Sequence, residues 1–240
     1  IIIVAVFCCV LSKSSPTQSQ CNHFDQEVTR KQAFVKAMFV EAWNAYERYA
    51  WGHEALDPVT RKAVSSRFGA ASGLTIVASM STMWVMGLRE QFSRGKHWIE
   101  TRFDFGNISS TVEVVDSVEN YIGSFLSSYA LTQDRMFLRK ALDVAKVLDP
   151  AFNSKTGLPY QKINPKTKSV AVVNPTLTAI AHKQPELIFL SAFSNGTTFK
   201  RRIEKIFNFF RDIVKTKGLY RRYVNVDSGV WDSDYSSLLH

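Results

Sequence analysis

Four polar residues of small bulk recur along one segment at the spacing of a helix face. They are separated by steps of three or four residues: Asp116, Asn120, Gly123 and Ser127. A helix over this segment places them in one line. Glycoside hydrolysis requires two carboxyl groups that face a pocket, so Asp116 is a candidate catalytic acid. The spacing leaves an alternative open, in which Asp116 is an exposed residue near a helix start, where the helix dipole favours a carboxylate.

The helix that must position this line is the clearest in the sequence. Its apolar residues also recur at steps of three and four: Val115, Val118, Ile122, Phe125 and Tyr129. This pattern predicts a helix over residues 112–131, with a core face beside the polar line.

Similar apolar periodicity predicts further helices, and Gly, Pro and turn-forming residues predict where these helices end. We expect helices over residues 30–51, 76–89, 92–102 and 137–148. Four turn-like residue pairs predict a long loop over residues 153–168.

An internal similarity indicates how the helices are arranged. Residues 131–139 and 193–201 match in residue type, and residues 86–94 repeat the pattern more loosely. Each copy is a helix, a tight polar turn and a second helix opened by Phe. Such helical hairpins cannot bury their faces singly, so they stack into an α-solenoid or close into an (α/α) toroid. The expected fold is therefore all-α, with a short β-hairpin around the Asp-Ser-Gly turn at 227–229.

Composition excludes several classes of protein. The chain has 240 residues, a formal net charge of +9 and 45% hydrophobic residues, which argues against disorder. Basic residues gather near the C-terminal end, but they suit a solvated helix face better than a nucleic-acid partner. The sequence contains no phosphate-binding glycine loop, metal-ligand cluster or Gly-x-Ser-x-Gly motif.

The N-terminal segment has the composition of a targeting signal. Residues 1–11 form an unbroken apolar run, and residues 12–31 are predicted to be a polar linker. The run fits a signal peptide, and a truncated signal anchor fits equally well. Glycosylation sequons at Asn107 and Asn195 agree with a luminal or extracellular destination.

Several blocks of residues resemble class I α-1,2-mannosidases, glycoside hydrolase family 47. They cover residues 32–240 in one order, and they comprise residues 42–46, 49–54, 82–88, 122–129, 137–141 and 150–152. The resemblance implies an (α/α) toroidal barrel, of which this chain is the N-terminal half, so that the toroid is incomplete. It also implies inverting removal of α-1,2-linked mannose from high-mannose N-glycans in the endoplasmic reticulum or Golgi lumen.

The resemblance further implies a calcium ion at the bottom of the pocket and, in many members, a type II membrane anchor. The family's calcium-binding threonine belongs to the absent half, so the resemblance assigns no metal ligand to this chain. The apolar residues 1–11 suit the anchor or a signal peptide.

The resemblance assigns the central roles to the helix that begins at Val112. The family's general acid is the Glu of a Glu-x-x-x-Arg pair, and Asp116 and Asn120 stand at those two positions. Asp is shorter than Glu by one methylene, and a misplacement of about 1 Å can cost on the order of a hundredfold in rate. Asn also lacks the fixed positive charge of Arg, which orients carboxylates and sugar hydroxyls.

Other family acids are also replaced. His53 and Glu54 align with part of a Trp-Gly-His-Asp-Glu-Leu motif and are candidate substrate-binding residues, as are Asn120 and Glu186. Glu186 keeps the acid of a Leu-Glu-Phe block. Uncharged residues stand at four other acidic positions: Ala55, Ala78, Ser81 and Ala179.

Because the aromatic frame stays while most acids change, we expect a retained fold with a weakened pocket, and this chain alone to be inactive. Neighbouring acids such as Glu47, Glu54 or Glu119 are an alternative source of catalytic carboxylates. Glu119 suits this role less well, because three helical steps turn it about 60° away from the direction of Asp116. A non-catalytic glycan-binding or quality-control protein, or a plain helical scaffold, is the alternative to an enzyme.

Overall fold

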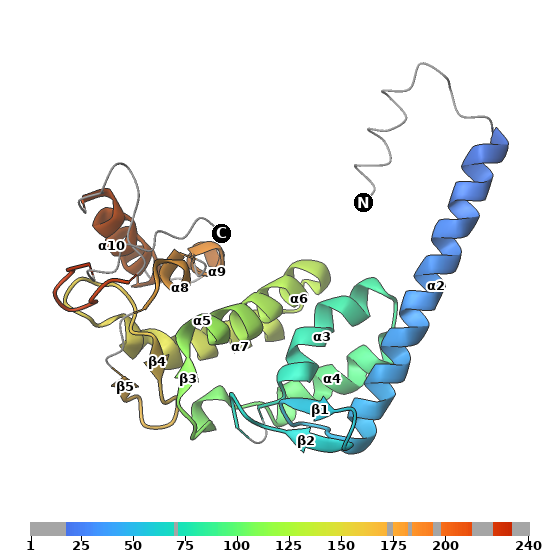
Figure 1. The fold of residues 1–240 in the computed structure, drawn as a ribbon, viewed down its shortest axis with the longest axis horizontal. Helices are drawn as coiled ribbons and strands as arrows, with labels where there is room; N and C mark the ends of the chain where they lie inside the picture. Colours follow the sequence, from blue (N-terminus) through green and yellow to red (C-terminus); the bar gives the residue numbers. More distant parts are fainter. Residues whose placement is uncertain are drawn as a thin grey trace. The chain divides into compact units, whose positions relative to one another are not determined.

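The structure is a computed structural model that describes residues 18–69, 72–171, 175–181, 184–193, 198–212 and 223–231. The described residues are mostly helical, with two small antiparallel sheets (Figure 1). Contacts divide the chain into two units, residues 1–48 and 49–240.

Helix α2 (Gln18–Tyr49) provides the described part of the first unit. It extends through residues 18–31, which we predicted to be a linker, because the chain contains no Gly or Pro between Pro16 and Gly52. The assignment of residues 32–240 to one domain stays a prediction. The apolar residues 1–11 lie outside the described residues.

Three pairs of consecutive helices pack as hairpins in the second unit. Helix α3 (Leu74–Val85) contacts α4 (Arg89–Thr101), and α6 (Ser124–Thr132) contacts α7 (Arg135–Leu148). Helix α9 (Gln184–Phe193) contacts α10 (Thr198–Asp212), and the short α8 (Leu177–Ala181) precedes this pair. The predicted stack of helical hairpins is confirmed.

The first helices of the three pairs also contact one another. Helix α6 contacts both α3 and α9, so these three helices form one row. The second helices are linked as well, since the rings of Phe92 in α4 and Phe137 in α7 are 6.0 Å apart. This arrangement of two rows is the one that an (α/α) toroid requires.

The start of α3 depends on a glycine. Gly73 adopts φ 57°, a left-handed conformation that residues with a Cβ rarely take. A Cβ at this position would lie 2.1 Å from the Trp98 ring, which no side chain could accept. Gly73 therefore lets the chain turn into α3 directly against α4.

The predicted helix over residues 112–131 is not uniform. Strand β3 (Val112–Glu113) comes first, and the helical part consists of α5 (Val114–Ser117), the π-helix η2 (Val118–Gly123) and α6. A π-helical turn inside an α-helix is rare and is often found at functional sites. It lies in the segment that carries the line of polar residues.

The two sheets were not predicted, because strands of two or three residues are too short to show alternation. Strands β1 (Ala55–Asp57) and β2 (Lys62–Val64) form a hairpin. Strand β3 pairs with β4 (Lys162–Ile163), and β4 pairs with β5 (Val170–Ala171). The expected loop over residues 153–168 therefore contains a strand.

Three short elements complete the described residues. The 3₁₀ turns are η1 (Phe105–Asn107) and η3 (Asp149–Phe152), the second of which ends α7 at Pro150. Near the C-terminal end, Val224 and Trp231 form an antiparallel bridge across the predicted Asp-Ser-Gly turn. The first residues of that hairpin pattern, 218–222, lie outside the described residues.

The core beside η2 is aromatic. Tyr121 is fully buried, and its ring lies 5.1 Å from the rings of both Phe68 and Phe105 and 5.5 Å from that of Phe103. Its hydroxyl donates a hydrogen bond of 3.2 Å to the Ser72 carbonyl. Each aromatic pair contributes about 0.5–1.5 kcal/mol beyond the area that it buries.

Asp134 joins the α6–α7 turn to α4. Its Oδ1 caps α7 by accepting the Met136 N–H at 2.9 Å, and its Oδ2 lies 2.6 Å from Lys96 Nζ. Burial tends to raise the pKa of Asp134, but the Lys96 and Met136 hydrogen bonds and the charges of Lys96 and Arg139 outweigh it and lower this pKa.

We predict that Asp134→Asn keeps the cap, loses the ion pair and lowers the free energy of unfolding by less than about 1 kcal/mol, because the pair is partly exposed. Asp134→Ala should cost about 1 kcal/mol more, since it also removes the cap. Because the pKa of Asp134 is lower in the folded state, its carboxylate stabilises the fold fully above the unfolded pKa of about 3.9. This stabilisation is lost as pH falls through the folded pKa. Urea unfolding of wild type and Asp134→Asn from pH 7 to pH 3 measures this. If the difference between their free energies of unfolding grew as pH fell, the prediction would be wrong.

Candidate functional site

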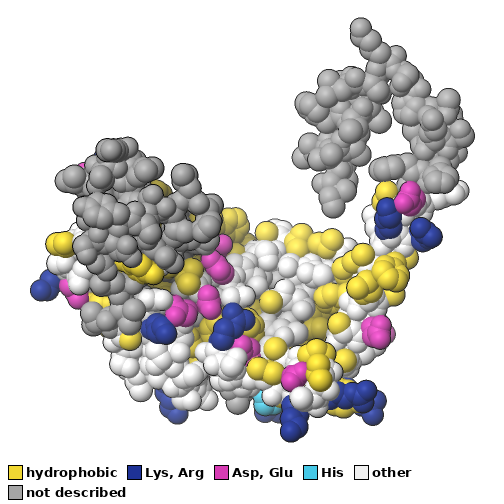
Figure 2. Space-filling view, in the orientation of Figure 1, with side chains coloured by type: hydrophobic (Ala, Val, Ile, Leu, Met, Phe, Trp, Pro, Cys, Tyr) yellow, Lys and Arg dark blue, Asp and Glu magenta, His cyan; other side chains and the backbone are white. Residues whose placement is uncertain are grey.

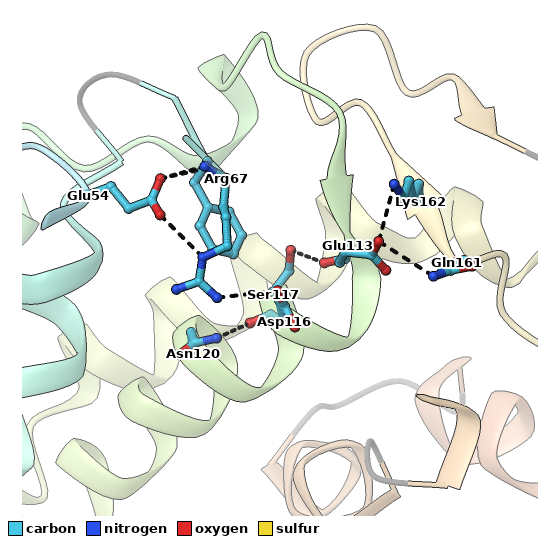
Figure 3. Close-up of polar contacts among 9 residues, drawn as sticks. Glu54, Arg67, Glu113, Asp116, Ser117, Asn120, Gln161 and Lys162 are labelled. Atoms are coloured by element: carbon cyan, nitrogen blue, oxygen red, sulfur yellow. Dashed lines mark hydrogen bonds and ion pairs between the residues drawn. The ribbon is translucent and has the colours of Figure 1, made fainter. Parts of the chain in front are cut away.

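Glu54 is a buried carboxylate at the entrance to the β1–β2 hairpin. Its residue is 3% exposed, and its Oε2 accepts the N–H groups of Arg67 at 2.8 Å and Phe68 at 3.0 Å. Its Oε1 accepts a hydrogen bond of 3.3 Å from Arg67 Nε (Figure 3). The carboxylate therefore holds both the backbone and the side chain of the residues that follow the hairpin.

The backbone of Glu54 also anchors α3. Its carbonyl accepts the Thr75 N–H at 3.1 Å and the Thr75 hydroxyl at 2.7 Å. One residue thus ties the hairpin to the first turn of a helix in the row of first helices.

Arg67 connects Glu54 to the line of polar residues. Its Nη1 lies 3.6 Å from Asp116 Oδ2, and Figure 3 shows the guanidinium between the two carboxylates. The Arg67 side chain is 57% exposed and that of Asp116 is 29% exposed. The pair therefore lies at the surface, whereas its anchor at Glu54 is buried.

Asn120 lies one turn after Asp116, and its amide is engaged by its own helix. Its Nδ2 donates a hydrogen bond of 2.8 Å to the backbone carbonyl of Asp116. The structure brings Asp116 and Asn120 together, but through this carbonyl and not through the Asp116 carboxylate.

Glu186 reaches the same helix from α9. A Cβ on Gly123 would lie 3.6 Å from Glu186 Cγ and 3.7 Å from its Oε1, which is ordinary van der Waals contact, so Glu186 lies directly beside this helix. Glu186 Oε2 is buried and has no hydrogen-bond partner among the described residues. The carboxylate thus lies against the segment that carries Asp116 and Asn120.

His53 and Ser127, which the sequence also singled out, each form a hydrogen bond with a residue other than Asp116. His53 is partly buried, and its Nδ1 is 3.3 Å from the Ser65 hydroxyl, at the base of the β1–β2 hairpin. Ser127, the last residue of the polar line, is exposed and donates to the Ser124 carbonyl of its own helix.

Arg67 was not among the residues singled out from the sequence. It lies 13 residues from Glu54 and 49 from Asp116, so no local spacing links the three. The available signal was general: a buried Glu requires hydrogen-bond donors, and a cation is a common one.

The described residues do not fit a calcium ion. Calcium takes six to eight oxygen ligands, and within the described ranges no group of three or more His, Cys, Asp or Glu side chains could hold a metal. The unpartnered oxygen of Glu186 supplies a single ligand. We therefore assign no chemistry to calcium in this part of the chain.

Charges of both signs are spread over the face drawn in Figure 2. Basic and acidic side chains alternate on the described residues there, without forming one continuous basic surface. Of the basic residues near the C-terminal end, Lys215, Lys217, Arg221 and Arg222 lie outside the described residues.

A family profile matches most of the chain. The profile of glycosyl hydrolase family 47 matches residues 38–239. This chain belongs to glycosyl hydrolase family 47. The resemblance seen in the sequence blocks is thereby confirmed.

Relatives within family 47 are mannosidases that are much longer than this chain. Mannosyl-oligosaccharide alpha-1,2-mannosidase IA of Spodoptera frugiperda is 35% identical over 221 residues, which cover 89% of this chain and 33% of the relative. The endoplasmic reticulum mannosyl-oligosaccharide 1,2-alpha-mannosidase of Homo sapiens is 32% identical over 209 residues, which cover 84% of this chain and 29% of the relative. The chain spans about a third of the length of these relatives.

A solved structure confirms the fold. The alpha-1,2-mannosidase from Trichoderma reesei matches with a TM-score of 0.76 and 21% identity, and the match covers 85% of this chain and 46% of that one. The fold class of family 47, the predicted toroid of helical hairpins, therefore holds for this chain.

The burial of Glu54 leads to a stability prediction. Glu54→Ala leaves the N–H groups of Arg67 and Phe68 without their acceptor, so we expect a loss of about 3 kcal/mol in the free energy of unfolding. Glu113→Ala is the matched control. Its carboxylate is 30% exposed and contacts Lys162 at 3.3 Å, so its removal should cost less than about 1 kcal/mol. Urea unfolding of both variants decides the matter, and equal losses would refute the structural role of Glu54.

Proposed function

We propose that this chain is part of a secretory-pathway α-1,2-mannosidase-type protein that binds high-mannose N-glycans in the endoplasmic reticulum or Golgi lumen. The observation that carries the proposal is the polar surface on α5 and η2, formed by Asp116, Asn120 and Gly123 with Glu186 against it. It occurs in a chain of a family whose relatives are named as mannosidases.

Asp116 and Asn120 have side chains that suit contact with a sugar. Asp116 is in the general-acid position of the family motif, and its carboxylate can also accept sugar hydroxyls. Glu186 adds a second carboxylate behind this surface, with one oxygen that is buried and has no hydrogen-bond partner among the described residues. Asn120 is a hydrogen-bonding amide beside Asp116. We also propose His53, at the base of the β1–β2 hairpin, as a substrate-binding residue. Glu54, whose two oxygens are both engaged, supports this surface by holding Arg67.

We propose that the chain alone binds glycan without hydrolysing it. Asp116 has one methylene less than the family's Glu, and Ala55, Ala78 and Ser81 replace other family acids. Hydrolysis needs an acid and a second carboxylate held at a defined separation. In the full-length protein, activity depends on the carboxylates and the calcium ligand that further residues supply.

A second candidate is a non-catalytic glycan-binding or quality-control protein. It is favoured by the ion pair of 3.6 Å between Asp116 and Arg67, because this pair engages the carboxylate at the family's general-acid position. Mannose release by the full-length protein separates the two candidates.

Delivery to the secretory pathway is proposed from residues 1–11, as a signal peptide or type II anchor. In the part of the chain that the structure describes, no helix is both long enough and apolar enough to cross a membrane.

We predict that Asp116→Glu restores the reach of the acid and raises mannose release by the full-length protein with calcium by up to about a hundredfold. The substrate is a high-mannose N-glycan, and free mannose is measured. Asp143→Glu, on the exposed face of α7, is the control and should leave the rate unchanged. If neither wild type nor Asp116→Glu releases mannose while both bind the glycan, the non-catalytic candidate is correct. Absence of binding would refute both candidates.

A further inference from the structure

Arg67 has the features of a ligand-binding residue, although nothing in the sequence pattern marks it. Its backbone N–H and its Nε are fixed by the buried Glu54, while more than half of its side chain is exposed. The guanidinium carbon also lies 5.9 Å from the centre of the Phe68 ring, which restricts its rotation. A cation that is held at its base and open at its tip is preorganised for an external partner.

The Arg67–Asp116 pair leaves its hydrogen-bonding capacity unused. At 3.6 Å the two groups attract each other electrostatically, but the distance is too long for a hydrogen bond. Within the described residues, neither the terminal nitrogens of Arg67 nor the Asp116 carboxylate makes a hydrogen bond. An oxygen that lies to one side of this gap can be within hydrogen-bond distance of both groups and so bridge them.

A sugar hydroxyl has the chemistry that such a bridge requires. Its oxygen accepts a hydrogen bond, and its O–H group donates one. One hydroxyl can therefore accept from Arg67 Nη1 and donate to Asp116 Oδ2 at the same time. An ammonium or carboxylate ligand could satisfy only one of the two groups and would be repelled by the other.

We propose that Arg67 is a glycan-binding residue, which with Asp116 holds one hydroxyl group of a mannose residue between them. In this role Arg67, which follows the β1–β2 hairpin, supplies the guanidinium that Asn120 does not carry on the helix. The inference rests on the proposed function, because it assumes that the site takes a mannoside.

The test uses the full-length protein and α-1,2-linked mannobiose, with affinities measured by isothermal titration calorimetry. Arg67→Gln should weaken binding about tenfold, the loss expected for one charge-assisted hydrogen bond. Its backbone N–H remains, so Glu54 keeps two of its three bonds and the variant should fold. Lys62→Gln, on exposed β2 of the same hairpin, removes the same charge and should bind within twofold of wild type.

Further measurements show whether Arg67 and Asp116 bind the same hydroxyl or two different ones. The double variant Arg67→Gln with Asp116→Asn should bind about as weakly as Arg67→Gln alone, since both lose the same bridge. A set of mannobioses that each lack one hydroxyl tests this further. One of them should bind to wild type about tenfold more weakly than mannobiose does, and should bind to Arg67→Gln as well as mannobiose does. Arg67→Lys keeps the charge without the Nε contact and should recover part of the affinity.

The outcomes are distinct. If wild type binds mannobiose and Arg67→Gln binds it equally, the inference is wrong while the proposed function stands. If no single deoxy sugar loses its effect in Arg67→Gln, the shared hydroxyl is excluded. If wild type does not bind the mannoside, the proposed function fails and the inference fails with it. Urea unfolding of each variant shows that a loss of affinity is not a loss of fold.

Discussion

The edge-to-face contact between Phe68 and Tyr121 joins the segment after the β1–β2 hairpin, which carries Arg67, to the helical segment that carries Asp116. The two ring centres are 5.1 Å apart, and both side chains are almost fully buried. Each aromatic residue is a direct neighbour in sequence of a polar residue at the site, Arg67 or Asn120. The packing of the core therefore sets the distance between the polar groups above it, because core side chains are close-packed and move little.

A buried carboxylate supports the same arrangement from the other side. Glu54 is costly to bury unless its oxygens accept hydrogen bonds, and two backbone N–H groups with a guanidinium meet that requirement. Glu54 therefore affects the site through Arg67 and not by direct contact with a ligand. A residue that aligns with a sugar-binding motif contributes here by fixing Arg67, which faces solvent beside Asp116. An acid at a position expected to bind sugar can therefore be engaged entirely within the protein, as both oxygens of Glu54 are.

The long helices of the fold could be predicted from the sequence, whereas the short elements could not. The hairpins α3–α4, α6–α7 and α9–α10 follow from apolar periodicity and from the internal similarity, since each helix is long enough to show a stripe. The π turn at η2 and the pairing of β3 with β4 did not follow. Both involve only a few residues, and strand pairing also depends on segments about 50 residues apart.

For the site, residue types and spacing along one helix were sufficient to select Asp116 and Asn120, and the family blocks were sufficient to select Glu186. The sequence alone therefore determined the stacked helical hairpins, the family and one polar helix face, because these are properties of local pattern and of matched motifs. Only the tertiary structure decided that Glu54 is buried, that Asn120 bonds its own helix and that Arg67 lies beside Asp116. Those contacts join residues that are distant in sequence, and their geometry is set by how the hairpin and the helices pack together.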